Sequence, residues 1–127
     1  MSTSQKKRIL LVDDEPNILV PVEFLMSQQG YEVDKAYNGK DALNKMERTV
    51  PDIVILDVMM PEMDGFEVAR QIRNNSGFDK TQIIFLTAKG TDNDKMNGYA
   101  TGGEVYITKP FDNDNLVQIV NDLAEFG

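Results

Sequence analysis

Apolar and polar positions form alternating blocks along this chain. Five short runs rich in β-branched and other apolar residues predict strands, at residues 8–12, 31–35, 52–56, 82–86 and 104–108. A longer segment follows each run and predicts a helix, near residues 15–29, 39–48, 64–74, 92–101 and 112–125. Strands that alternate with helices are typical of βαβ units, whose right-handed crossovers build a parallel sheet. The pattern therefore predicts an α/β fold with a doubly wound, five-stranded parallel sheet.

The last predicted helix has the clearest periodicity. Leu116, Ile119, Val120 and Leu123 follow the i, i+3, i+4, i+7 spacing of one helix face. Asp112 precedes them and is a candidate N-cap, because its carboxylate can accept hydrogen bonds from the free amides of the first turn. This segment therefore predicts a helix with one buried face.

Two other predicted helices are less regular. Pro21 falls inside the first helix, where proline removes one backbone hydrogen bond and is expected to kink the helix. Pro16 falls in the first turn of the same helix, where proline is tolerated. The fourth helix, near 92–101, has few apolar anchors and several poor helix formers. We expect this fourth helix to be the most mobile.

Length and composition indicate one soluble domain. The chain has 127 residues, of which 41% are apolar and 27% charged, and its formal net charge is −8. This length supports a real hydrophobic core, and the negative charge argues against direct nucleic-acid binding. We expect a disordered tail at 1–7 and one domain at 8–127. The tail lacks the apolar core of a signal peptide, and no apolar run approaches the length of a membrane span, so we expect no membrane insertion.

Cysteine and histidine are both absent. Without cysteine the chain has no disulfide and no thiolate metal site, which fits a reducing, cytoplasmic location. Without histidine it has no histidine-based metal site or catalytic triad and cannot itself carry a phosphohistidine. Any chemistry must therefore come from other side chains.

Polar side chains follow four of the predicted strands. Asp13 and Asp14 end the first apolar run, Asp57 ends the third, Thr87 the fourth and Lys109 the fifth. In open α/β sheets the chemistry lies at the carboxyl ends of the strands, where these residues would meet. The sequence therefore predicts three carboxylates, one hydroxyl and one ammonium at a single sheet edge.

Such a group of carboxylates is suited to phosphoryl chemistry. Carboxylates held together repel one another, and a hard divalent cation such as Mg²⁺ offsets that repulsion while keeping water and phosphate oxygens as further ligands. A carboxylate can also act as a nucleophile and form an aspartyl phosphate, whose charge a lysine, a hydroxyl and Mg²⁺ would stabilise. Taken singly, each residue also has an ordinary explanation: a helix cap, a turn or a solvated charge.

Four sequence fragments carry a resemblance to a known family. They lie at 9–15, 55–65, 85–88 and 106–111, in order and at compatible spacing. With them the chain resembles, over 8–126, a response-regulator receiver domain of two-component signalling, similar to the single-domain chemotaxis type. The resemblance implies a flavodoxin-like three-layer sandwich with strand order 2-1-3-4-5.

The resemblance also implies a role for each acid. Asp57 would accept a phosphoryl group from a histidine kinase or phosphotransfer protein. Asp14 and Asp57 would bind Mg²⁺ directly, with the backbone carbonyl of Met59 as a further ligand and Asp13 acting through water. Such a domain is not an enzyme in the usual sense, because it catalyses only its own phosphotransfer and autodephosphorylation.

Three further residues would respond to the phosphoryl group. Lys109 would pair with it, Thr87 would hydrogen-bond to it, and Tyr106 would be the switch aromatic that rotates inward when Thr87 moves. The bond before Pro110 would be cis. The surface near Tyr99 and Tyr106, formed by the fourth helix, fifth strand and fifth helix, would bind an unidentified downstream protein, and the domain would be a monomer or a weak phosphorylation-dependent dimer.

The chain departs from the family pattern at a few positions. Gly102-Gly103 stands where the family more often has Gly-Ala, so we expect a looser loop there. Pro21 is uncommon and would perturb the face that docks the kinase. Neither departure touches the phosphorylation chemistry.

Other interpretations remain open at this stage. A small Mg²⁺-dependent phosphatase of the haloacid-dehalogenase type also uses an aspartate nucleophile, but it carries Asp-x-Asp on its first strand, unlike Asp13-Asp14-Glu15. A receiver-like binding module would usually lack one of the acids or the lysine. The chain could also be the receiver half of a larger regulator. The glycine-rich nucleotide-binding motifs are absent.

Overall fold

The structure is a computed structural model and describes residues 6–126. Its strands are β1 (Arg8–Val12), β2 (Glu32–Ala36), β3 (Ile53–Leu56), β4 (Gln82–Thr87) and β5 (Val105–Thr108). Its α-helices are α1 (Pro16–Gln28), α2 (Gly39–Arg48), α3 (Gly65–Arg73), α4 (Asp92–Ala100) and α5 (Asn113–Phe126). A short 3-10 helix, η1 (Ser76–Phe78), was not predicted.

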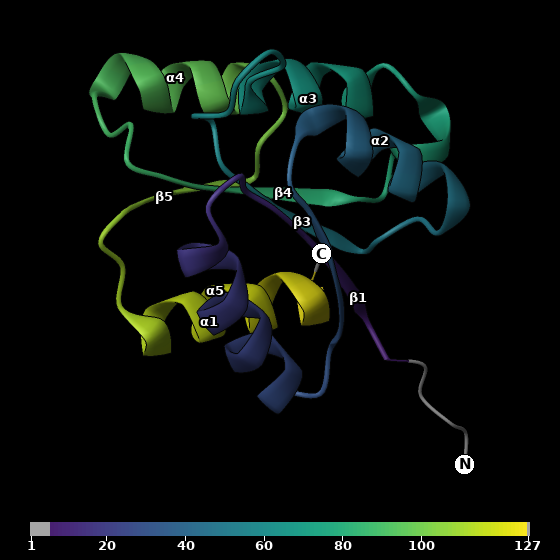
Figure 1. The fold of residues 1–127 in the computed structure, drawn as a ribbon, viewed down its shortest axis with the longest axis vertical. Coiled ribbons are helices and arrows are strands. Elements are labelled where there is room, and N and C mark those ends of the chain that lie inside the picture. Colours follow the sequence, from purple (N-terminus) through teal and green to yellow (C-terminus); the bar gives the residue numbers. More distant parts are fainter. Residues whose placement is uncertain (1–5, 127) are drawn as a thin grey trace.

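The predicted α/β fold is confirmed. All neighbouring strands pair in parallel, and their order is β2-β1-β3-β4-β5. Helices α1 and α5 cover one face of the sheet and α2, α3 and α4 cover the other, which makes a three-layer sandwich (Figure 1). The carboxyl ends of β1, β3, β4 and β5 therefore meet at one edge.

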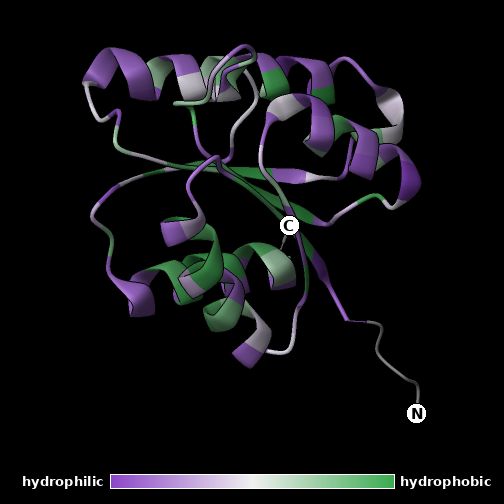
Figure 2. Cartoon of the chain, in the orientation of Figure 1, coloured by the Kyte–Doolittle hydropathy of each residue, from purple (hydrophilic) through white to green (hydrophobic). Residues whose placement is uncertain are grey.

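The core divides into two clusters, one on each face of the sheet, because successive strand residues point to opposite faces. In β1, Leu10 and Val12 face one cluster, whereas Ile9 and Leu11 face the other. Figure 2 shows hydrophobic strands in the middle layer and mainly hydrophilic helices above them. Such near-continuous apolar strands are expected of a sheet buried on both faces.

The second strand was predicted one residue too early, at 31–35. It runs from Glu32 to Ala36, because the chain is still closing α1 before it: Gly30 has φ 93°, and the Tyr31 amide donates to the carbonyl of Met26. The Glu32 amide donates to the Lys7 carbonyl at 3.0 Å, so the first pairing lies inside the predicted tail. Residues 1–5 of that tail lie outside the described residues.

The two helices with the less regular sequence patterns, α1 and α4, are both present in the structure. Helix α1 continues through Pro21, which is exposed, and the kink remains a prediction. In α4 only Gly98 is buried. A Cβ atom at Gly98 would lie 2.5 Å from Cδ2 of Tyr106, so glycine allows α4 to approach β5. This sparse packing agrees with the expected lack of apolar anchors, whereas mobility remains a prediction.

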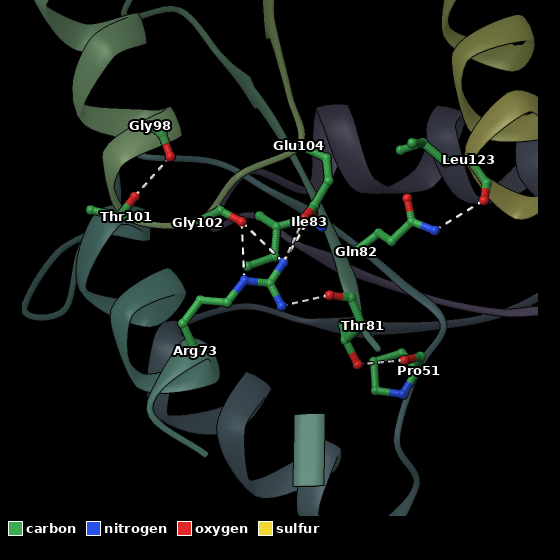
Figure 3. Close-up of polar contacts among 10 residues, drawn as sticks. All are labelled: Pro51, Arg73, Thr81, Gln82, Ile83, Gly98, Thr101, Gly102, Glu104 and Leu123. Carbon is green, nitrogen blue, oxygen red and sulfur yellow. Dashed lines mark hydrogen bonds and ion pairs between the residues drawn. The ribbon is translucent and has the colours of Figure 1, made fainter. Parts of the chain in front are cut away.

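A polar cluster holds the opposite, amino edge of the sheet (Figure 3). The Arg73 guanidinium donates to the carbonyls of Gly102 and Thr81, at 3.0–3.1 Å and 2.7 Å, and to the Glu104 carboxylate at 2.9 Å. Glu104 in turn accepts from the Ile83 amide at 2.6 Å. We call this group the Arg73 clamp. It holds the Gly102-Gly103 loop that we expected to be loose.

None of the helices in residues 6–126 combines the length and the apolar character that crossing a membrane requires.

Candidate functional site: an acidic site at the carboxyl edge of the sheet

Asp57 is fixed where β3 ends. Its amide donates to the Val12 carbonyl at 2.9 Å, and its side chain is 3% exposed. Carboxylate atom Oδ1 accepts from the Met59 amide at 3.1 Å. Helix α3 begins directly against this turn, because Gly65 has no Cβ, an atom that would lie 2.2 Å from the Asp57 carbonyl oxygen. Packing thus positions the carboxylate before any ligand does.

Asp13 and Lys109 come to the same place from distant parts of the chain. Lys109 Nζ donates to Asp13 Oδ2 at 3.0 Å and lies 3.6 Å from Asp57 Oδ2. Asp13 Oδ1 accepts from the Glu15 amide at 2.9 Å. The Lys109-Pro110 bond is cis, as predicted. The predicted carboxylate–lysine group is therefore assembled.

The pKa values of this group reflect both burial and its neighbours. Burial raises the pKa of Asp13, whereas the hydrogen bonds from Glu15 and Lys109 lower it in part. Burial by itself lowers the pKa of Lys109. Its hydrogen bond to Asp13 and the negative charges of Asp57, Asp13 and Glu15 outweigh burial, so the pKa of Lys109 is raised. The lysine therefore stays charged at neutral pH.

The site holds more acid than the sequence predicted. Oxygen atoms of Asp13, Asp14, Glu15 and Asp57 all lie within 4.8 Å of one another. Asp13 and Asp57 are buried, whereas Asp14 and Glu15 are exposed. Glu15 was missed, although its place directly after two acids was a signal. We call these four carboxylates together with Lys109 the acidic site.

The residues of the acidic site fit Mg²⁺. Their donors are carboxylate oxygens, which Mg²⁺ prefers, and one side of the cluster is exposed to solvent, where bound water can remain. Four carboxylates face a single ammonium, so the site has formal negative charge for a cation to offset.

Thr87 and Tyr106 lie beside this site on β4 and β5. Thr87 is fully buried, and its Oγ1 accepts from the Lys89 amide at 3.3 Å. Tyr106 is 8% exposed, donates its hydroxyl to the Lys89 carbonyl at 2.6 Å, and packs against Phe85 with ring centroids 5.6 Å apart. Tyr106 is therefore buried while Thr87 accepts from the Lys89 amide, and both residues contact the backbone of Lys89. The rotation of Tyr106 remains a prediction.

Comparison with known proteins agrees with this geometry. The family model for the response regulator receiver domain matches residues 9–121. The chain belongs to this family. Phosphorylation-dependent switching is the general function of receiver domains, which bind Mg²⁺ at an acidic pocket and interact with histidine kinases or phosphotransfer proteins and with downstream targets. Receiver domains are signalling proteins and mostly not enzymes.

Individual relatives support the same assignment. The receiver domain is 38% identical over 116 residues to the response regulator Rre1 of Synechocystis, covering 91% of this chain and 50% of that protein. It is 42% identical over 105 residues to the alkaline phosphatase synthesis transcriptional regulatory protein PhoP of Bacillus subtilis, covering 83% and 43%. The chain thus spans half or less of the length of these relatives.

The fold is also similar to a solved chemotaxis protein. The structure of CheY4 from Vibrio cholerae superposes with a TM-score of 0.88 at 33% identity, covering 94% of this chain and 99% of that chain. The predicted likeness to a chemotaxis receiver is therefore confirmed at the level of fold.

Proposed function

We propose that this receiver domain accepts a phosphoryl group on Asp57 from a histidine kinase or phosphotransfer protein. The observation that carries the proposal is the buried Asp57 carboxylate with Lys109 Nζ 3.6 Å away, inside a cluster with excess negative charge. An Asp57 oxygen attacks phosphorus, and the bond from phosphorus to the donor's imidazole nitrogen breaks. The bonding electrons leave with the imidazole.

Each neighbour has a separate task in this step. Asp14 and Asp57 would hold Mg²⁺ together with the Met59 carbonyl, and Asp13 would act through water. When bound, the cation offsets charge on the transferring group. Lys109 pairs with the phosphoryl oxygens after giving up part of its contact with Asp13.

We expect the signal to pass through the backbone of Lys89, which contacts both Thr87 and Tyr106. Drawing the Thr87 hydroxyl toward the phosphoryl group competes with its hydrogen bond from the Lys89 amide. Tyr106 is bonded to the carbonyl of the same residue, so a change at Lys89 alters the preference of the ring for its buried position. The surface of α4, β5 and α5 then binds a downstream protein in the cytoplasm.

Mass spectrometry tests the phosphoacceptor. Acetyl phosphate with Mg²⁺ should add one phosphoryl group to the wild type and to a control, Asp52→Asn, at the amino edge of the sheet. Asp57→Asn should take up none, and EDTA should abolish labelling of the wild type. Equal labelling of Asp57→Asn would overturn the assignment.

Amide hydrogen exchange tests the output surface. Beryllofluoride, a phosphoryl mimic, added with Mg²⁺ should change exchange most within residues 88–106, because α4 has little buried surface to hold it. Thr87→Ala should reduce that change while still being labelled by acetyl phosphate. Changes confined to the loops around Asp13 and Asp57 would place the output elsewhere.

A further inference from the structure

Glu15 has a carboxylate that its own helix does not use. It is the N-cap residue of α1, and its side chain makes no capping hydrogen bond. Its backbone carbonyl begins the helical hydrogen bonding instead, because it accepts from the amides of Ile18 and Leu19 at 3.0 and 3.2 Å. Preferred N-cap residues are shorter and bond the first-turn amides through their side chains. Helix capping therefore does not explain glutamate at this position.

The Glu15 carboxylate lies instead with the acids of the site. One of its oxygens falls within 4.8 Å of oxygens on Asp13, Asp14 and Asp57. Its amide holds Asp13 Oδ1 at 2.9 Å, so the turn that orients Asp13 also sets the start of the Glu15 side chain. Unlike Asp13 and Asp57, Glu15 is exposed, which places it on the solvent side of the cluster.

We propose that Glu15 is a further metal-binding residue of the acidic site, acting on Mg²⁺ through metal-bound water. Mg²⁺ takes oxygens at about 2.0–2.1 Å in octahedral geometry, so adjacent ligands lie about 2.9 Å apart and opposite ones about 4.1 Å. The four carboxylates lie within 4.8 Å of one another, and Mg²⁺ in protein sites usually keeps several waters, so an acid on the solvent side can bind the cation through one of those waters. The exposed member faces the side where Mg²⁺ keeps its waters.

This inference rests on the proposed function and deepens it. The charge of Glu15 adds to the attraction for the cation, and its oxygens can orient bound water. Removing an outer-sphere partner of this kind commonly lowers metal affinity by about 10-fold or more. Glu15 is thus a positioning residue, whose loss should weaken Mg²⁺ binding.

Isothermal titration calorimetry with Mg²⁺ alone measures this effect directly. The Kd of Glu15→Gln should rise about 10-fold, and the Mg²⁺ concentration for half-maximal labelling by acetyl phosphate should rise by the same factor. Glu15→Asp keeps the charge and should recover most of the affinity. Glu47→Gln removes one exposed carboxylate on α2, far from the site, and should bind Mg²⁺ like the wild type.

The outcomes separate this inference from the proposed function. A Kd for Glu15→Gln within about twofold of wild type would overturn the role of Glu15, even with Asp57 labelled normally. An equal loss in Glu47→Gln would also overturn it, because the effect would then be one of total charge. A wild type that binds Mg²⁺ but takes no label at Asp57 would overturn the proposed function instead. Urea unfolding of both glutamine variants in EDTA establishes that the compared proteins are folded.

Discussion

The two edges of the sheet both carry ionised side chains, but their charges are balanced differently. At the amino edge the Arg73 clamp pairs one guanidinium with one carboxylate and two carbonyls. At the carboxyl edge the acidic site sets four carboxylates against one ammonium. The clamp is satisfied within the protein, whereas the acidic site leaves negative charge unmatched.

This difference separates a structural role from a functional one. A charged group whose hydrogen bonds are made within the protein stabilises the fold, and it has few free donors or acceptors with which to bind a ligand. Like charges held together raise the energy of the folded state and are relieved by a cation or by loss of a charge. We therefore expect substitutions at the two edges to have opposite effects on stability.

The largest expected effect comes from breaking the clamp. Arg73→Met keeps the apolar stem beside Gly102 but removes the charged donors, and should lower the free energy of unfolding by about 2–3 kcal/mol. Urea unfolding measures the loss. Arg70→Met, on the same helix, removes an exposed pair with Glu67 and should cost less than about 0.5 kcal/mol. Similar losses in the two variants would show that Arg73 has no special structural role.

A smaller effect of opposite sign is expected at the acidic site. Asp57→Asn removes one charge from the carboxylate cluster, and in EDTA it should raise the free energy of unfolding by about 1 kcal/mol. Mg²⁺ at ten times its Kd should stabilise the wild type by about 1.4 kcal/mol and the variant far less.

Glu104→Gln is the matched change at the amino edge. It removes one carboxylate from the clamp, so it should lose stability, and Mg²⁺ should affect it as it affects the wild type. A loss of stability in Asp57→Asn in EDTA would contradict the view that the acidic site is held under repulsion.

The smallest expected effect concerns β5, which lies between Glu104 of the Arg73 clamp and Lys109 of the acidic site. Burial, followed by the charges of Asp94 and Asp57, raises the pKa of Tyr106 from 10.0 to about 12. Because the folded state holds this proton more tightly than the unfolded state, stability from Tyr106 is present below pH 10 and is lost as pH rises toward 12.

Tyr106→Phe removes that proton along with the hydrogen bond to Lys89. It should cost about 0.5–1 kcal/mol at pH 7 and lose stability less steeply than the wild type between pH 10 and 12. Unfolding by urea at several pH values measures both quantities, with Tyr37→Phe as the control at an exposed tyrosine. Parallel pH profiles for wild type and Tyr106→Phe would refute the linkage.

The sequence by itself determined the order and type of the α-helices and strands. Apolar runs and helical spacing are local properties, so each predicted strand and α-helix lies within one residue of its observed ends. Local capping was predictable too: Asp112 accepts from the Asp114 amide at 2.8 Å, as its position before the last helix suggested. The acids at the strand ends were also visible, because a parallel sheet gathers those ends at one edge.

Only the tertiary structure decided which hydrogen bonds the charged side chains form. Lys109 and Asp13, 96 residues apart, were expected at one sheet edge, but only the fold shows that Lys109 donates to Asp13. The bonds of Arg73 to Gly102 and Glu104, in the α4–β5 loop, were not predicted. No periodicity reports such pairs, because electrostatic pairing depends on distance in space. The direction of the Glu15 side chain depends on how α1 begins beside β1. In a sequence it is one more surface acid, whereas in the fold it lies with the carboxylates of the acidic site.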